Sequence, residues 1–255
     1  MIRKLARTLG PAVGIALAAA ALSGCSGAVA FDTGEGVPLA DLDLTGAAPT
    51  GLVLAGPDNA VVTRGDRLAI KVEGDPEAAA ALRFTLEDDA LGIMRETDLR
   101  SEGTATVRVT LPALTQLTLA GSGTVDADRM DGNAEATIAG SGTARVAALT
   151  ADKLDVTLAG SGTFGAAGTA RSLDLTIAGS GSGRMGGLAV ETADVTIAGS
   201  GDAAFASDGT VDASIMGSGA VTVTGNATCT INAMGSGTLR CNPAPAAATA
   251  RPASE

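Results

Sequence analysis

The sequence predicts an all-β fold in which the chain winds as a parallel β-helix, with about seven regular C-terminal coils and an irregular N-terminal β cap. The first observation is the tripeptide Gly-Ser-Gly, which recurs every 18–20 residues and starts at positions 121, 140, 160, 179, 199, 217 and 235. The second is an alternation of apolar and polar residues before each copy. Self-similarity at a fixed period indicates a stack of like structural units.

Each copy is preceded by a segment with the period-two pattern of a β-strand. Two residues before the tripeptide stand apolar side chains, namely Leu119, Ile138, Leu158, Ile177, Ile197, Ile215 and Ala233. Three residues before it stand polar side chains, namely Thr118, Thr137, Thr157, Thr176, Thr196, Ser214 and Asn232. A second set of inward candidates follows the tripeptide, namely Val125, Val146, Phe164, Met185, Phe205 and Val221.

A unit with strand on both sides of a glycine bend fits one coil of a β-helix. Because strands of adjacent coils lie about 4.8 Å apart, seven coils would rise roughly 30 Å. A bend that repeats in register needs backbone angles and close approaches that glycine permits. An antiparallel meander of hairpins could have the same period, but the β-helix is preferred because like residues then stack in columns.

The segment 51–113 lacks Gly-Ser-Gly and is predicted to cap the first coil, since a repeat stack needs an atypical end. Its short apolar runs are separated by turn-forming residues, which is typical of all-β structure. Asp75 as N-cap and Pro76 at the first helical position favour one helical turn there. We therefore expect a single domain over 51–242, made of the cap and of coils over 114–242, with a tether over 25–50 and a disordered tail over 243–255.

The N-terminus has the pattern of an export signal. Arg3, Lys4 and Arg7 form a basic region, and residues 12–22 form an apolar run that is too short to span a bilayer as a stable helix. Residues 1–24 are therefore predicted to be a signal peptide that is removed from the mature protein.

The segment Leu22-Ser23-Gly24-Cys25 resembles the bacterial lipobox, which predicts Cys25 as the lipidated first residue of the mature protein. Ser26 after this cysteine resembles lipoproteins that are sorted to the outer membrane. The alternative is ordinary cleavage after Ala30, which would release a soluble periplasmic or secreted protein.

The composition excludes several classes of function. The net charge of −11 at pH 7 opposes binding to nucleic acid, whose phosphate backbone requires a positive surface. The chain has no histidine, which removes the commonest general base and metal ligand, and with it Ser-His and Cys-His nucleophile pairs. We predict a protein that is not an enzyme and has no cofactor.

Five residues before Gly-Ser-Gly the repeat places acidic side chains, namely Glu135, Asp155, Asp174, Asp194 and Asp212. Neighbouring carboxylates about 4.8 Å apart repel by roughly 0.9 kcal/mol per pair in water before screening by salt. The column must be solvated, offset by arginine or bound to cations. A solvated face is favoured, and calcium is the alternative, with Asp155, Asp174, Asp194 and Asp212 as candidate ligands.

Two cysteines flank the last copy of the tripeptide. Cys229 and Cys241 lie six residues before and six residues after Gly235, and both have inward parity. In an exported protein this spacing favours a disulfide, which stabilises by roughly 3 kcal/mol through a loop of about a dozen residues. The alternative is two buried free thiols.

Four motifs precede the repeat, namely Gly51-Leu52-Val53-Leu54-Ala55-Gly56-Pro57, Thr63-Arg64-Gly65-Asp66, Leu91-Gly92-Ile93 and Leu111-Pro112-Ala113-Leu114. Together with the Gly-Ser-Gly units that follow, they resemble the bacterial head GIN family of putative autotransporter-adhesin head domains over about residues 50–242. The resemblance implies a right-handed β-helix in exported, often lipid-anchored proteins, and it implies no catalytic residue. The stretch 92–100 departs from the family, because it is more charged than expected of a strand.

These observations predict an exported lipoprotein, anchored to the outer membrane through its lipid, that presents acidic and hydroxyl faces for adhesion or another interaction at the envelope. The expected partner is an envelope or extracellular ligand such as a glycan. One alternative is a carbohydrate-active β-helix enzyme, since Asp side chains two coils apart would lie about 9.6 Å apart, close to the separation that inverting hydrolysis uses. Another is a purely structural component of the envelope.

Overall fold

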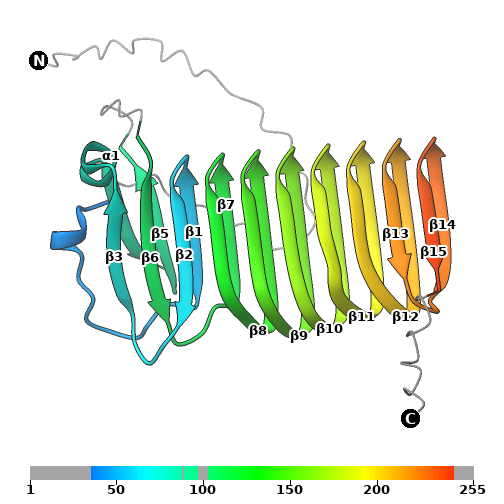
Figure 1. Cartoon of the computed structure of the whole chain (residues 1–255), viewed down its shortest axis with the longest axis horizontal. Helices are drawn as coiled ribbons and strands as arrows, with labels where there is room; N and C mark the ends of the chain where they lie inside the picture. The colour runs from blue at the N-terminus through cyan, green and yellow to red at the C-terminus, as the bar shows by residue number, and fades with distance from the viewer. Residues whose placement is uncertain (1–35, 88, 97–102, 244–255) are drawn as a thin grey trace, which may run out of the picture. The chain divides into compact units, whose positions relative to one another are not determined.

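The computed structural model describes residues 36–87, 89–96 and 103–243 of the chain. Within them the protein is a parallel β-solenoid of about seven turns, and its strands form one 15-stranded sheet that follows the stack (Figure 1). The fold class predicted from the repeat is therefore confirmed. The predicted signal peptide, Cys25 and residues 244–255 of the predicted tail lie outside the described residues.

In the regular coils a strand starts directly after each Gly-Ser-Gly, and all but two of the strands end at the first glycine of a copy. They are β7 (Gln116–Gly121), β8 (Thr124–Gly140), β9 (Thr143–Gly160), β10 (Thr163–Gly179), β11 (Ser182–Gly199), β12 (Asp202–Gly217), β13 (Ala220–Thr224), β14 (Thr228–Gly235) and β15 (Thr238–Asn242). Neighbouring strands are parallel, and the glycine bends stack in register, so that Gly140 pairs with Gly121 and with Gly160. We call the part of each coil before the tripeptide its first arm and the part after it its second arm.

The core lies between the two arms and contains the apolar positions expected from the alternation. Ile138, Leu158 and Ile177 are fully buried and stack directly on one another in the first arms. The second arms contribute Val125, Val146, Phe164, Met185, Phe205 and Val221, all of which are buried. The predicted inward set is thus confirmed, except in the last coil, where Ala233 is exposed.

The first glycine of each bend is required by its conformation and by its neighbours. Gly140 has a φ of 122°, a value that other residues rarely adopt. A Cβ atom at this position would lie 2.4 Å from the carbonyl oxygen of Gly121 in the preceding coil. The bend can therefore stack in register only if each of its first positions is glycine.

Two strands from the segment predicted as a cap continue the register of the coils. They are β1 (Gly51–Gly56), which pairs with β7 and sets Gly56 opposite Gly121, and β2 (Asn59–Arg64), which pairs with β8. The turn between them, Gly56-Pro57-Asp58, occupies the place of Gly-Ser-Gly. The solenoid geometry therefore begins earlier in the sequence than the tripeptide does.

Antiparallel strands and one short helix close the N-terminal end of the stack (Figure 1). The antiparallel pairs are β3 (Ala69–Gly74) with β6 (Ala105–Leu111) and β4 (Leu82–Glu87) with β5 (Ala90–Arg95). The helix α1 (Pro76–Ala80) begins after Asp75, whose side chain accepts hydrogen bonds from the N–H groups of Glu77 and Ala78, as predicted. A 3-10 turn, η1 (Leu39–Asp41), precedes β1.

The charged stretch 92–100 is strand up to Arg95. Strand β5 pairs with β1 in parallel on one edge and with β4 in antiparallel on the other. Its buried residues Leu91 and Ile93 belong to the core.

No helix within 36–87, 89–96 and 103–243 is long and apolar enough to cross a membrane.

Candidate functional site

The acidic side chains expected to form a column do form one on the outer face of the first arms. Glu135 pairs with Asp155, Asp155 with Asp174, Asp174 with Asp194, and Asp194 with Asp212. We call these five residues the acidic ladder. They point outward because they alternate with buried residues along each strand.

A lysine that the sequence analysis did not consider offsets part of the acidic ladder. The Nζ atom of Lys153 lies 2.9 Å from Oδ1 of Asp155 and 2.9 Å from Oδ2 of Asp174. Hydrogen bonds to Asp174 and then to Asp155 hold the pKa of Lys153 above its usual value. The cation that bridges two coils of the acidic ladder is therefore a lysine, whereas the sequence analysis names arginine for this role.

Glu135 at the N-terminal end of the acidic ladder has a different environment. Its pKa is raised, first because the carboxyl group is partly buried and second because Asp155 lies nearby, and Lys153 opposes the shift. Asp194 and Asp212 at the other end are exposed. The carboxyl group with the raised pKa therefore lies at the N-terminal end of the acidic ladder.

A second ladder of hydroxyl groups runs beside the acidic ladder. Thr137, Thr157, Thr176 and Thr196 pair in succession across β8 to β11, and Ser214 continues the row in β12. These positions are two residues after the acidic ones and so share their face of the sheet. The first arms therefore present parallel rows of carboxylate and hydroxyl oxygens.

The candidate calcium ligands are spread along the ladder rather than gathered round one point. Among the residues that the structure describes, no group of three or more histidine, cysteine, aspartate or glutamate side chains could hold a metal ion. Calcium prefers six to eight oxygen ligands, which several carboxylates converging on one centre would supply.

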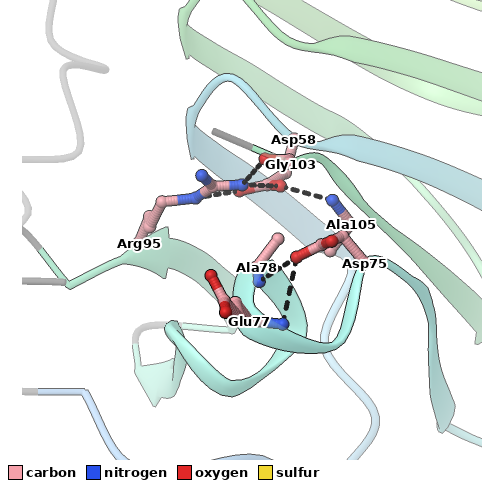
Figure 2. A network of polar contacts seen from close by, with 7 residues as sticks. All are labelled: Asp58, Asp75, Glu77, Ala78, Arg95, Gly103 and Ala105. Atoms are coloured by element: carbon pink, nitrogen blue, oxygen red, sulfur yellow. Dashed lines mark hydrogen bonds and ion pairs between the residues drawn. The ribbon is translucent and has the colours of Figure 1, made fainter. Parts of the chain in front are cut away.

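A buried ion pair that sequence reasoning missed joins the first coil to the cap (Figure 2). Nε of Arg95, at the end of β5, donates to Oδ2 of Asp58 at 2.9 Å, and Nη2 donates to the other carboxylate oxygen and, at 3.0 Å, to the carbonyl oxygen of Gly103. The backbone N–H of Ala105 donates to Oδ1 of Asp58 at 2.8 Å. This network joins three chain segments at the N-terminal end of the solenoid.

At the opposite end of the stack, Cys229 and Cys241 are joined by a disulfide with their Cα atoms 6.7 Å apart. The bond links β14 to β15, the two arms of the last coil. Beyond them the core side of this coil is partly uncovered, since 43% of the surface of Ile231 is exposed. The disulfide therefore lies in the last coil of the described chain, which packs against a neighbouring coil on one side only.

The fold is thus a parallel solenoid whose first arms carry repeated rows of polar side chains. The chain belongs to the family described as "Putative auto-transporter adhesin, head GIN domain", whose model matches residues 48–227. The resemblance drawn from the N-terminal motifs is thus confirmed. The family suggests an exported or surface protein whose role is not enzymatic.

Structures of the same fold come from species of Bacteroides and Parabacteroides. One from Bacteroides fragilis, described as a "putative adhesin", has 21% identity and a TM-score of 0.69, and the match covers 76% of this chain and 92% of that one. Another, from Parabacteroides distasonis and described as a "putative lipid binding protein", has 20% identity and a TM-score of 0.59, with 77% and 94% covered. A third, a "putative adhesin" from Parabacteroides merdae, has 18% identity and a TM-score of 0.60, with 76% and 91% covered. The comparison with curated proteins found no match.

Proposed function

We propose that the protein is an adhesin head on an exported lipoprotein, and that it binds its partner through the face of the first arms. The observation that carries this proposal is the register of the acidic and hydroxyl ladders, which repeats the same pair of groups along five successive strands. Each contact with a partner would be weak in water, but a regular row lets a repetitive ligand engage several at once, which multiplies affinity. A hydroxyl-rich polymer such as a glycan is itself repetitive and carries many hydrogen-bonding groups.

The test is binding of the full chain to an array of bacterial and host glycans, followed by titration of each polysaccharide that binds, with and without calcium. Asp194→Lys in the ladder is expected to abolish or strongly weaken binding. Asp202→Lys is the matched control, since Asp202 is also exposed but lies on the second arm, outside the ladder. Binding that the two variants weaken equally, or no binding by the parent chain, would contradict the proposal and favour a structural role. Depolymerisation of a bound glycan would favour an enzyme instead.

The membrane anchor is a separate part of the proposal and rests on the sequence around Cys25. The mass of the mature protein isolated from the membrane fraction should correspond to a chain that starts at Cys25 and carries acyl groups. Cys25→Ser should release the protein from the outer membrane without changing glycan binding by the purified chain. A mature N-terminus at Phe31 with no lipid would contradict the anchor and support the soluble alternative.

A further inference from the structure

A groove crosses the second arms of the solenoid on a surface that the ladders do not occupy. It has a volume of about 520 Å³ and is lined by residues of β2, β8, β9, β10 and β11. Small residues on β9 and β10, including Ala147, Gly165 and Ala167, line its floor, and Val61 on β2 lies at one end. Sites for small molecules typically have volumes of 300–1,000 Å³ and mostly apolar walls with a few polar groups. The groove has that size and that character.

Two arginines stand in this groove on either side of a glycine. Arg145 on β9 pairs with Gly165 on β10, which pairs with Arg184 on β11, so the two arginines are two strands apart, or about 9.6 Å at the backbone. Gly165 does not have a positive φ, and a Cβ atom there would lie no closer than 3.4 Å to its nearest neighbour, the carbonyl oxygen of Arg184. The backbone does not require glycine at this position. Its effect is to leave open the space between the two guanidinium groups.

The charges around the groove leave one arginine available to an anion. Arg145 Nη1 lies 3.5 Å from Oδ1 of Asp126, and Asp128 accepts a hydrogen bond of 2.8 Å from the backbone N–H of Arg64. Arg184 is exposed and takes part in no ion pair with another described residue.

We propose that this groove binds an amphipathic anion, with a single carboxylate or phosphate headgroup held by Arg184 and Arg145 and an aliphatic chain lying over Gly165, Ala147 and Ala167. Guanidinium groups hold such headgroups through charge-assisted hydrogen bonds. The apolar floor of the groove suits a hydrocarbon chain. The site does not depend on the adhesive face proposed above, because it lies on the other arm of the coil.

The experiment uses the full chain and three 12-carbon probes at concentrations below those at which they form micelles. Laurate carries a carboxylate, dodecanol has the same chain without a charge, and dodecyltrimethylammonium has the same chain with a positive charge. Isothermal titration calorimetry should show saturable binding of laurate at one site and binding of the other two that is at least tenfold weaker. Vesicles of phosphatidylglycerol, compared with vesicles of phosphatidylcholine, identify whether a lipid headgroup can be the source of the anion.

Paired variants separate the contribution of charge from that of space. Arg184→Gln should weaken laurate binding by about tenfold or more, which corresponds to losing one charge-assisted hydrogen bond. Gly165→Leu fills the floor without changing the charge and should weaken binding to a similar extent. Arg240→Gln is the matched control, because Arg240 continues the same column in the last coil through Ala204 and Thr222 but lies outside the groove.

One further variant is expected to bind laurate more tightly than the parent chain. Asp126→Asn removes the carboxylate that competes for Arg145 and should tighten laurate binding severalfold. Circular dichroism of each variant checks that the fold is retained. Measurable binding of laurate and dodecanol with equal affinity, no binding of either laurate or phosphatidylglycerol vesicles, or unchanged affinity in both Arg184→Gln and Gly165→Leu would overturn the proposal. Binding to phosphatidylglycerol vesicles that Arg184→Gln weakens, without binding of laurate, would support it and assign the anion to a lipid headgroup.

Discussion

Asp58 and Arg95 form a buried ion pair between the first bend of the solenoid and the end of β5. The side chain of Asp58 is 1% exposed and that of Arg95 is 12% exposed. Because Gly56 pairs with Gly121 and Asn59 pairs with Thr124, Asp58 occupies the place that the third residue of Gly-Ser-Gly has in the regular coils. The carboxylate of Asp58 therefore connects the first bend of the solenoid to two strands of the cap. It binds Arg95 at the end of β5 and accepts a hydrogen bond from the N–H of Ala105 at the start of β6.

Removing one partner of this pair should be far more costly than removing both. Arg95→Met leaves the carboxylate of Asp58 buried without its cation, and we expect a loss of roughly 3–5 kcal/mol in the free energy of unfolding. Asp58→Leu combined with Arg95→Met should recover part of that loss, because the desolvation of the charges is then avoided. Urea unfolding followed by circular dichroism measures both.

The control for this cycle is the exposed pair between Arg171 and Asp152, whose nearest nitrogen and oxygen lie 3.2 Å apart. Arg171→Met should change stability by at most about 1 kcal/mol, as surface ion pairs do. An Arg95→Met variant that is no less stable than Arg171→Met would show that the buried pair does not hold the cap in place.

The same pair shows how far sequence reasoning reaches in this fold. The core positions, the acidic ladder and the N-cap at Asp75 follow from local spacing, because each is set by period-two alternation or by contacts within a turn. The partner of Arg95 is 37 residues away, and no local pattern connects the two. The sequence alone therefore marks the stretch 92–100 as more charged than expected of a strand, whereas the buried contact with Asp58 explains why Arg95 lies at the end of one.

Neither the coil formed by β1 and β2 nor the groove on the second arms could be predicted from the sequence repeat. The turn Gly56-Pro57-Asp58 shares only its first residue with Gly-Ser-Gly, so the coil formed by β1 and β2 has no signature in the repeat. The groove depends on Arg145, Gly165 and Arg184, which vary within their column while the structural columns stay constant. The sequence repeat therefore predicts the positions that all coils share, but it does not predict residues that occur in a single coil.

The glycine bends provide a second prediction about stability. Gly160 has a φ of 116°, and a Cβ atom there would lie 2.6 Å from the carbonyl oxygen of Gly140. Gly160→Ala should therefore lower the free energy of unfolding by roughly 1–3 kcal/mol. Gly186→Ala is the control, since a Cβ atom at Gly186 has no neighbour within 4 Å and its φ is not positive. That variant should be neutral or slightly stabilising, and equal losses in the two would refute the role assigned to the bend.

The raised pKa of Glu135 predicts an unusual dependence of stability on pH. A carboxyl group whose pKa is raised by folding stabilises the folded state when protonated, and this contribution is present below its usual pKa and is lost as the pH rises through the raised value. Glu135→Gln should therefore be slightly more stable than the parent chain at pH 7 and equal to it at acidic pH. Thermal unfolding between pH 3 and pH 8 measures the difference.

Glu73 serves as a control because folding shifts its pKa in the opposite direction. Hydrogen bonds from Lys71 and then from Arg108 lower its pKa to about 2, so its contribution is present above the usual pKa of glutamate and is lost as the pH falls toward about 2. Glu73→Gln should be less stable than the parent chain at pH 7, and the difference should shrink on acidification. If both variants shift stability in the same direction at pH 7, the assignment for Glu135 is wrong.

The bridge from Lys153 to Asp155 and Asp174 predicts a dependence on salt. Lys153→Gln removes the only cation that an ion pair places on the acidic ladder in the described chain, so neighbouring carboxylates repel without compensation. The variant should lose melting temperature relative to the parent at 10 mM NaCl, where the screening length is about 30 Å, and recover it at 1 M, where that length is about 3 Å. Lys153→Arg keeps the charge and should behave as the parent does. A loss that is independent of salt would point to packing of the lysine stem instead.

The disulfide between Cys229 and Cys241 predicts where the solenoid begins to unfold. The last coil has a neighbouring coil on one side only, and 72% of the surface of Met234 is exposed. Closing the loop between residues 12 positions apart should stabilise the folded chain by roughly 3 kcal/mol. Hydrogen exchange should therefore increase in β14 and β15 when the bond is reduced, while β9 and β10 remain protected, because stacked coils depend on their nearest neighbours. Thiol labelling of the unfolded, unreduced protein checks the bond itself, and modification of both cysteines would show that it does not form.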